Sequence, residues 1–301
     1  GDQPALICEH IDWARSCGFE VTAAGKGTRY LPDYHSLTPD TVWAVLQQYL
    51  DIDNPESINL QMFNSFLDGS KSAIEMTAVC NATGLIPQNA GLQFPSASRF
   101  ELADICKPSS DGGVLTRSGT TEVVSSLTRV GETVAHHLAM GTFVVIQAGS
   151  DYARQCLREY HMLPDKTGQY GALYRPTHMI GLELGVSIAS VALRGEPTGQ
   201  PMCFSSDVVA IAKRDLKIGE LLDGEGGHCV FGRQMPSEKS LSARTVPLGL
   251  SAGMRLVRNV ASGQMLCRDD VDVGTPDEAT LARDEMVSAF APPKIPPATQ
   301  Q

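Results

Sequence analysis

The first 27 residues constrain the fold of this chain most, because they combine a helix pattern, a strand pattern and a glycine turn. Residues 3–17 are expected to form a helix, since their apolar side chains recur at the spacing of one helix face: Leu6, Ile7, Ile11 and Ala14. Gly18 is suited to end that helix. Residues 19–24 (FEVTAA) then predict a strand that enters a turn at residues 25–27. This order is typical of the later part of an α/β sheet. We therefore predict an α/β protein that begins with the C-terminal part of a Rossmann sheet.

The middle of the chain predicts a mixed α+β catalytic domain. The helix over 178–194 is so apolar that we expect it in the core. The segment 85–121 is rich in proline, serine and glycine and predicts irregular loop structure. The remaining patterns predict a strand over 142–148 and helices over 38–50, 56–67, 70–82 and 151–163.

The end of the chain predicts a small β-rich module. From residue 205 the sequence consists of short apolar runs separated by glycines and charged turns. Residues 212–222 and 257–267 form a weak internal repeat, which indicates two equivalent strand-turn units. The proline-rich segment 292–301 is predicted to be disordered. We therefore divide the chain into four parts. Residues 1–30 are the end of a Rossmann-type domain and residues 31–200 a catalytic domain. Residues 201–273 form the β-rich module, and residues 274–301 a partly disordered tail.

The charge of the chain argues against several kinds of partner. The formal net charge is −10, whereas nucleic acids and anionic membranes are bound by clustered lysine and arginine. No apolar run approaches the roughly 20 residues that span a bilayer. The eight cysteines include no close pair, which favours reduced thiols in the cytoplasm over a zinc site. We therefore predict a cytoplasmic protein that acts on a small molecule, without nucleic acid or membrane as a partner.

The usual motifs for binding a dinucleotide or a metal are missing from the sequence. It contains no G-x-G-x-x-G loop, and Gly25-Lys26-Gly27 lacks the third glycine and the helix that should follow. His136 and His137 are adjacent, so on a helix they would point about 100° apart and could not chelate one ion. We predict no metal site. Gly25 and Lys26 are candidate cofactor contacts, because ligands of open α/β sheets bind at the C-terminal ends of strands. Lys26 is also a candidate for binding a substrate anion, with a solvent-exposed turn lysine as the alternative.

Charged residues at the start of the 70–82 helix are the candidate catalytic groups. Lys71 and Glu75 are four residues apart, so they share one helix face and can pair, and Asp68 lies at the helix start. A lysine held near carboxylates can polarise the oxygen of a carbonyl or alkoxide during hydride transfer, and the helix N-terminus adds positive potential. The alternative interpretation is an exposed ion pair without a chemical role.

Four further polar residues are candidates for binding the substrate. Arg175 could hold a phosphate or carboxylate through two hydrogen bonds. His178, near the start of an apolar helix, could act as an acid or a base. Arg117 and Asn81 are weaker candidates of the same type. A purely structural corner is the alternative for residues 174–178.

A series of short motifs along the chain resembles one oxidoreductase family. The series consists of Asp2–Pro4, Glu20–Gly27, Phe66–Lys71, Asn81–Gly84, Asp111–Leu115, Tyr174–Pro176, His178 and Gly181–Glu183. Together these motifs resemble the deoxyxylulose-phosphate-reductoisomerase-like oxidoreductases, which are often labelled homoserine-dehydrogenase-like and end in an SAF domain. The resemblance covers about residues 1–273. Within it, residues 205–273 resemble the SAF domain, a small β-clip-like module.

The resemblance implies a Rossmann domain, a catalytic domain and an SAF module, usually assembled as a homodimer. It also implies NADP- or NAD-dependent chemistry on a small hydroxy or keto substrate, with a sugar phosphate as one candidate, and it leaves a divalent metal open. Lys71, Lys26 and Arg175 lie in matching motifs, which strengthens their assigned roles. Most of the family's Rossmann domain, with its glycine-rich loop, is missing from this sequence. We therefore expect this chain alone to be inactive or weakly active.

Two other functions stay open at this point. One is a non-catalytic fragment that binds a sugar acid or supports dimerisation. The other is an SAF-containing sugar-acid lyase or dehydratase, which would need a divalent metal and no nicotinamide. Titration with NADPH would separate the oxidoreductase from both.

Overall fold

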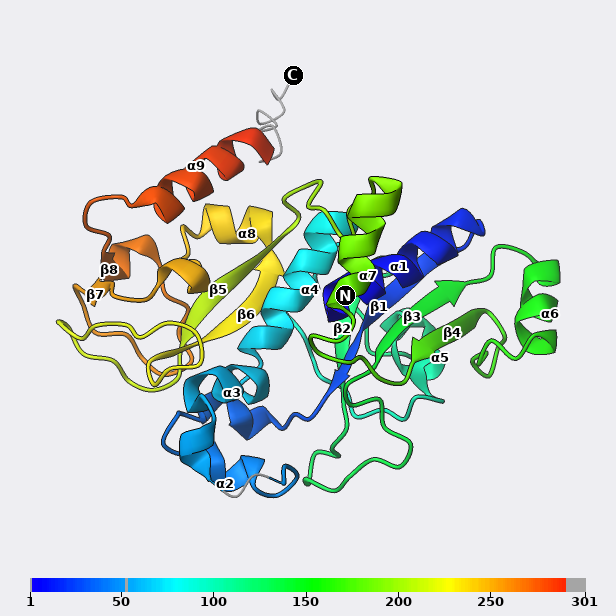
Figure 1. Cartoon of the computed structure of the whole chain (residues 1–301), viewed down its shortest axis with the longest axis horizontal. Coiled ribbons are helices and arrows are strands. Elements are labelled where there is room, and N and C mark those ends of the chain that lie inside the picture. The colour runs from blue at the N-terminus through cyan, green and yellow to red at the C-terminus, as the bar shows by residue number, and fades with distance from the viewer. Residues whose placement is uncertain (1, 52–53, 291–301) are drawn as a thin grey trace.

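The computed structural model describes residues 2–51 and 54–290. A four-stranded sheet with its helices forms one part of the molecule, and a β-rich part built from residue 206 onward lies beside it (Figure 1). Helix α4 (Ser70–Thr83) runs between the two parts and packs on both, with Met76 and Val79 in the core of the first and Ile74 against the core of the second.

The four-stranded sheet has the order β2-β1-β3-β4. Strand β1 (Glu20–Thr28) runs parallel to β2 (Thr120–Ser125) and antiparallel to β3 (Thr142–Gln147), which in turn is antiparallel to β4 (Tyr170–Arg175). The predicted strands over 19–24 and 142–148 are confirmed as β1 and β3, and the α/β class is confirmed with them. The strand directions are mixed, whereas those of a Rossmann sheet are mostly parallel.

The predicted turn at residues 25–27 is wrong, because β1 continues through it to Thr28. A Cβ atom at Gly25 would lie 1.7 Å from the backbone oxygen of Glu122, and one at Gly27 would lie 2.0 Å from that of Leu138. These glycines therefore allow a close approach of neighbouring backbone within the sheet. As a result, Lys26 lies in a central strand and is buried.

Each face of the sheet is covered by helices. Helix α1 (Gln3–Ser16) and α4 pack on one face, and the short α5 (Leu102–Ile105) packs on the other. Alternate residues of β1 point to opposite faces, so Ala24 lies in the core with α1 and α4, whereas Ala23 lies in the core with α5. The predictions for α1 and α4 are confirmed.

Two predicted helices are shorter than expected. Within 38–50 only α2 (Trp43–Leu46) is a regular α-helix, because the backbone hydrogen bonds there alternate between i→i+3 and i→i+4. Helix α3 (Leu60–Leu67) begins later than residue 56, because the Asn59 side chain caps it by accepting a hydrogen bond from the Met62 N–H. The helix predicted over 151–163 is present as α6 (Asp151–Glu159), which ends four residues earlier than expected.

Two strands, β2 and β4, lie where we predict none. In β2 all six residues are buried, so its sequence TTEVVS shows no alternation between polar and apolar side chains. The predicted loop over 85–121 is otherwise mostly irregular, apart from α5 and a 3₁₀ turn at Ser109–Asp111.

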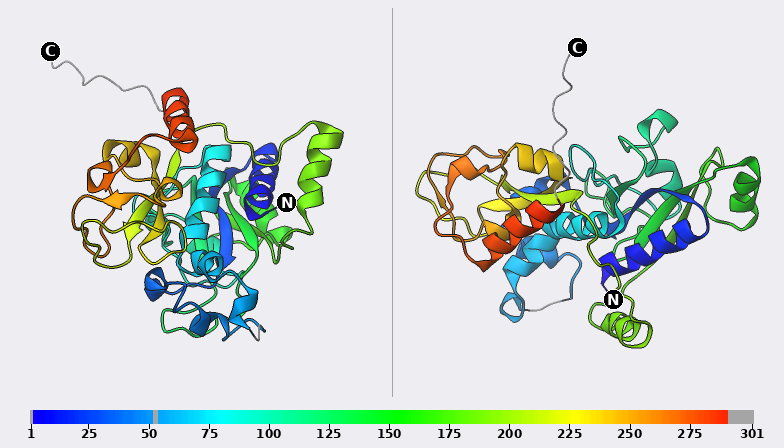
Figure 2. Two further views of the ribbon diagram at one scale, coloured as in Figure 1. Left: turned by 60° about the vertical axis from the view of Figure 1, so that its left-hand side comes forward. Right: turned by 90° about the horizontal axis from the view of Figure 1, so that it is seen from above.

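The helix predicted over 178–194 is wrong in extent and in environment. It is regular only over α7 (Leu184–Ala189), which continues as a π-helical segment (Ser190–Arg194). Its large apolar side chains are exposed, not in the core. Figure 2 shows this segment standing apart from the sheet, beyond α1.

The β-rich part contains two small antiparallel sheets. One pairs β5 (Ser206–Ala212) with β6 (Val230–Pro236), and the other pairs β7 (Arg255–Leu256) with β8 (Val271–Asp272). The two segments of the internal repeat contact each other, since Leu216 and Val260 exchange both backbone hydrogen bonds.

Two helices complete this part of the molecule. They are α8 (Ser237–Ser242) and α9 (Glu278–Phe290), and α9 lies within the segment predicted as a tail. The predicted disorder of 292–301 falls outside the described residues.

Candidate functional site

Two lysines from different elements share one carboxylate. The Lys26 Nζ, from the middle of β1, donates a hydrogen bond to Glu75 Oε2 on α4 and another to Gln3 Oε1 on α1, the latter at 3.1 Å. Lys71 Nζ lies 3.5 Å from the second oxygen of the same carboxylate, Glu75 Oε1. The i, i+4 pairing predicted for Lys71 and Glu75 is therefore present, and Lys26 joins it from the sheet.

The three charged groups differ in their access to solvent. The side chains of Lys26 and Glu75 are 7% and 6% exposed, whereas that of Lys71 is 34% exposed. A buried carboxylate needs charged partners and hydrogen bonds, which the two lysines provide. Lys71 is thus held from inside by Glu75 and can present its ammonium group to a ligand arriving from solvent.

Gln3 belongs to this cluster but was not among the candidate site residues, although it lies in one of the motifs that resemble the oxidoreductase family. It lies in the first turn of α1, is 4% exposed, and binds Lys26 through its side-chain oxygen. Its amide nitrogen lies 3.5 Å from the Gly141 carbonyl. The sequence signals are that motif at residues 2–4 and the position of Gln3 at a helix start.

Asp68 is buried and engaged with other groups. One of its oxygens accepts the Ser70 N–H at the start of α4, and the other lies 2.8 Å from the Lys213 Nζ. Lys213 also donates to the carbonyls of Leu37 and Gly227. Asp68 therefore fixes the start of α4 to the β-rich part, and the structure pairs it with Lys213, not with Lys71.

Aromatic residues support the same end of α4. His35 Nδ1 hydrogen-bonds to the carbonyl of Asp68 at 2.7 Å, and its Nε2 lies 2.6 Å from the Tyr30 hydroxyl. The His35 ring stacks on Phe231, and Tyr30 stacks on Phe94. Burial lowers the pKa of His35, which favours its neutral form as a structural hydrogen-bonding group.

Arg175 and His178 bind other parts of the chain. Arg175 forms an ion pair with Glu183. His178 is buried, and its Nδ1 hydrogen-bonds to the Met140 carbonyl, while its Nε2 lies 3.5 Å from an Asp2 oxygen. Both residues hold the base of the exposed segment that carries α7.

The other two candidate substrate-binding residues lie elsewhere. Arg117 is exposed, and its Nε donates to the neighbouring Ser118 carbonyl. The Asn81 side chain accepts the N–H groups of Ser205 and Ser206 and donates to the Ser206 carbonyl. Asn81 therefore joins α4 to the start of β5.

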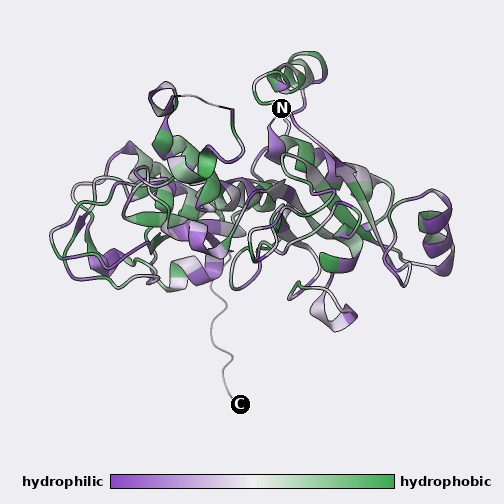
Figure 3. Ribbon diagram, turned by 90° about the horizontal axis from the view of Figure 1, so that it is seen from below, coloured by the Kyte–Doolittle hydropathy of each residue, from purple (hydrophilic) through white to green (hydrophobic). Residues whose placement is uncertain are grey.

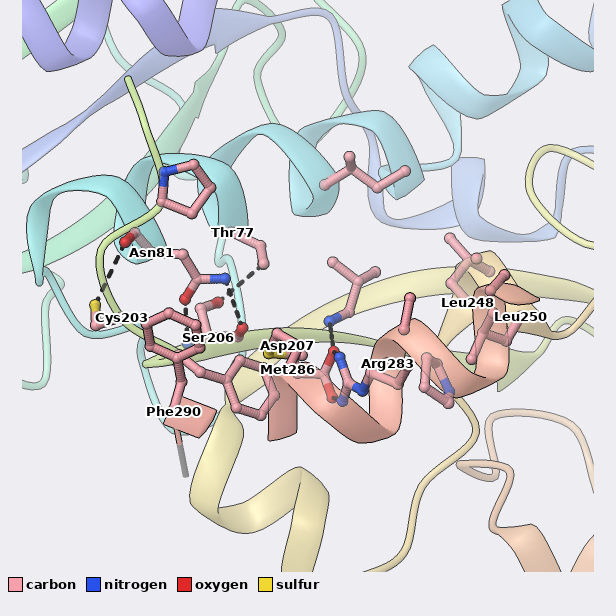
Figure 4. Close-up of a pocket in the computed structure, with 18 residues that line it drawn as sticks. Thr77, Asn81, Cys203, Ser206, Asp207, Leu248, Leu250, Arg283, Met286 and Phe290 are labelled. Atoms are coloured by element: carbon pink, nitrogen blue, oxygen red, sulfur yellow. Dashed lines mark hydrogen bonds and ion pairs between the residues drawn. The ribbon is translucent and has the colours of Figure 1, made fainter. Parts of the chain in front are cut away.

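A pocket of about 620 Å³ lies between α4, β5 and α9, and α4 lines it with Ile74, Thr77 and Asn81. Figure 4 shows Thr77 and Asn81 of α4 hydrogen-bonded to Ser206 of β5, with Arg283, Met286 and Phe290 of α9 beside them. Neither Lys71 nor Glu75 lines it. We place the candidate site at the lysines because charged groups that could take part in catalysis meet there.

The residues named for the cofactor do not fit a phosphate-binding loop. Gly25 and Lys26 lie inside β1, paired with β2 on one side and β3 on the other. Lys26 is already bound to Glu75 and Gln3. A phosphate loop instead offers free backbone N–H groups at a helix N-terminus.

Over 2–51 and 54–290, no three histidine, cysteine or acidic side chains gather closely enough to hold a metal ion. No helix in those ranges is long and apolar enough to cross a membrane.

The chain was compared with known proteins. No curated protein matches this sequence. Residues 1–184 match the family model described as the catalytic domain of oxidoreductase DRL. That match ends inside the exposed segment and includes β1, α4 and the Lys26–Glu75–Lys71 cluster. Because the match covers more than half of the 301 residues, this chain belongs to the family of oxidoreductase DRL catalytic domains.

Proposed function

We propose that the chain supplies the oxygen-binding side of an oxidoreductase site that acts on a small hydroxy or keto substrate, with a sugar phosphate as one candidate. The observation that carries the proposal is the buried Glu75 carboxylate shared by a buried and a partly exposed lysine. An ion pair that served the surface alone would not need a second lysine from the middle of the sheet.

The roles of the three residues follow from their positions. Lys71 donates a hydrogen bond to the carbonyl oxygen of the substrate and a proton to the alkoxide that forms when that carbonyl is reduced. Glu75 positions the Lys71 ammonium group. Lys26, held by Gln3, positions Glu75 and does not itself reach the solvent side. Lys71 is thus the catalytic residue, and Glu75 and Lys26 are positioning residues.

The proposal includes a nicotinamide coenzyme because the family resemblance implies one. The coenzyme would accept or supply the hydride. None of the described residues is assigned to it, because Gly25 and Lys26 are occupied within the sheet. A homodimeric assembly and the identity of the β-rich part as an SAF domain belong to the same proposal. Two strand-turn units in contact through Leu216 and Val260 support the latter.

The test compares Lys71→Ala and Lys71→Arg with the unchanged residue, in the full-length protein for turnover and in this chain for substrate binding. NADPH consumption is followed with a panel of small ketones, hydroxy acids and phosphorylated ketones, and binding of dihydroxyacetone phosphate is measured by calorimetry. We expect Lys71→Ala to lower kcat/KM by about 10²–10⁴-fold, as for loss of a general acid, and Lys71→Arg to retain part of it. Lys239→Ala, which removes an exposed lysine of α8, is the matched control. Full turnover and full binding in Lys71→Ala would reject the assignment.

Two alternatives are separated by simpler measurements. A fragment that only binds or dimerises would show neither NADPH binding nor turnover with any substrate of the panel. A lyase or dehydratase would release product without nicotinamide and would lose activity with a chelator. The oxidoreductase is favoured because the family match lies over the lysine cluster.

A further inference from the structure

Two arginines near the junction of the sheet and the β-rich part have no acidic partner. Arg233 lies in β6, and Arg129 follows the end of β2. Among the described residues, neither guanidinium group forms an ion pair with a carboxylate, and that of Arg233 forms no hydrogen bond either. Figures 1 and 3 show the two parts of the molecule side by side, with β6 in the β-rich part.

The two arginine side chains contact the same loop, residues 91–93. Arg129, which is exposed, donates a hydrogen bond from Nη2 to the Gln93 carbonyl at 3.0 Å. The aliphatic stem of Arg233 packs on Gly91, where an added Cβ atom would lie 3.1 Å from Arg233 Cγ and 2.9 Å from the backbone oxygen of Gln234. The loop therefore lies close against β6 and connects the surroundings of the two arginines.

Both positive charges act on one buried ring. The Tyr30 ring stacks on that of Phe94, the residue after Gln93, with 3.8 Å between the ring centroids. Burial raises the pKa of the Tyr30 phenol, and the charges of Arg129 and Arg233 both oppose that rise. Because such effects weaken with distance, both guanidinium groups lie near Tyr30.

The charge of Arg233 is half-buried and uncompensated. Burial lowers the pKa of its guanidinium group, and no carboxylate opposes that shift. The Phe231 ring lies 5.9 Å from the guanidinium carbon, at the outer limit of cation–π attraction. Burying a charge without a partner destabilises the fold, so an anion bound to Arg233 would remove an unfavourable contribution.

A shortage of acidic residues does not explain the missing partner. The chain contains 34 aspartates and glutamates against 24 lysines and arginines. Arg283 of α9 is mostly buried and pairs with Asp207 through two hydrogen bonds. Arg29 and Arg99 lack a carboxylate, but each lies closer to an aromatic ring, at 4.7 Å and 5.1 Å. Arg233 has neither kind of compensation.

We propose that Arg129 and Arg233 form a binding site for the phosphate group of a small molecule. Guanidinium groups hold phosphate through paired N–H···O hydrogen bonds, and a phosphate dianion compensates two positive charges at once. One arginine belongs to the sheet part and the other to the β-rich part, so the site is complete only when the two parts pack together.

Free phosphate and a phosphorylated substrate offer the same chemistry to this site. The proposal rests on the proposed function for the second source alone, because a sugar phosphate is one of the candidate substrates there. The two sources are separated by comparing inorganic phosphate with dihydroxyacetone phosphate.

The experiment measures binding of these two compounds to the full chain by calorimetry, in a buffer of low salt without other oxyanions. We expect both compounds to bind. Arg233→Met keeps an aliphatic side chain on Gly91 but removes the charge, and it should weaken binding about ten- to a hundredfold. Arg129→Gln should weaken binding in the same direction. The control Arg255→Gln removes an exposed arginine of the β-rich part that donates only to the Gly219 carbonyl, and it should bind like the unchanged chain.

Thermal unfolding distinguishes a binding role from a structural one. Without phosphate, Arg233→Met should be at least as stable as the unchanged chain, because it removes an uncompensated charge. Added phosphate should raise the unfolding midpoint of the unchanged chain and leave that of Arg233→Met unaltered. Arg233→Lys keeps the charge without the paired donors; it should bind with intermediate affinity and serves if Arg233→Met does not fold.

Two results would overturn the proposal: neither compound binds the unchanged chain, or both bind Arg233→Met as tightly as the unchanged chain. Tighter binding of dihydroxyacetone phosphate than of phosphate, weakened further by Lys71→Ala, supports the site and assigns it to the substrate. Equal binding of both compounds, independent of Lys71, supports the site and assigns it to free phosphate. Full turnover in Lys71→Ala would reject the proposed function and leave phosphate binding at the arginines intact, so the two failures are distinguishable.

Discussion

Exchanging Lys26 and Glu75 for methionine, singly and together, tests whether these two side chains stabilise the fold as one coupled ion pair. In the single variant Glu75→Met, the Lys26 ammonium remains buried at 7% exposure with only Gln3 as a partner. In Lys26→Met, the Glu75 carboxylate remains buried but keeps Lys71 at 3.5 Å. The two single variants should therefore lower the free energy of unfolding by different amounts.

The expected magnitudes follow from these remaining partners. Removing one partner of a buried ion pair costs about 3–5 kcal/mol, and we expect Glu75→Met to fall in this range. Lys26→Met should cost about 3 kcal/mol or less, because Lys71 still compensates the carboxylate. Replacing both groups leaves no buried charge, so the double variant should lie within about 2 kcal/mol of the unchanged chain. The summed cost of the two single variants should therefore exceed the cost of the double variant by a coupling free energy of about 1 kcal/mol or more.

The free energy of unfolding of the four proteins can be measured by urea titration, with circular dichroism and tryptophan fluorescence followed in parallel. Comparison of the midpoints and slopes shows whether the transition stays cooperative. A double variant as unstable as the sum of the two single variants would refute the reasoning, because Lys26 and Glu75 would then act independently.

Three further predictions concern residues of the sheet and of α4. Burial raises the pKa of Glu122 to about 7, above the unfolded value of about 4.3. The native state therefore binds the proton more tightly, and stability should fall by roughly 3 kcal/mol as the pH rises from about 4 to 7. Urea midpoints should show this fall, and Glu122→Gln should flatten it. Gly25→Ala brings a Cβ to 1.7 Å from a backbone oxygen, so thermal unfolding should show a loss of about 3 kcal/mol or more; Gly249→Ala, which meets no atom within 4 Å, should be nearly neutral. Asn81→Ala leaves the two N–H groups that it binds without acceptors and should cost about 1–3 kcal/mol, with faster hydrogen exchange at the start of β5; unchanged exchange there would contradict the role given to Asn81.

Local patterns predicted the elements that carry the site. The i, i+4 spacing of Lys71 and Glu75 and the glycine after residue 83 were sufficient to predict α4 and one ion pair within it. The prediction of a turn at residues 25–27 failed because those glycines are needed for the close approach of backbone at Glu122 of β2 and at Leu138. That approach depends on residues about a hundred positions away.

Long-range contacts account for what the sequence did not reveal. Gln3 and Lys213 look like ordinary polar residues, and their importance appears only when folding brings them to Lys26 and Asp68. Similarly, the run from Met179 to Leu193 is apolar enough for a core helix. The local sequence does not reveal that, in the described structure, no other element covers these side chains.

Helix α4 also bears on how this chain could be rearranged during evolution. The match to the oxidoreductase family stops at residue 184, yet one side of α4 is covered by β5 and β6, which come later in the chain. A gene truncated where the similarity ends would encode Asp68 without its cation and Ile74 without the β-rich part it packs on. The segment that matches the family model is therefore shorter than the segment that would have to be transferred for α4 to keep all its packing partners. If recombination separated the matched segment from the β-rich part, the side of α4 that packs on β5 and β6 would need new partners.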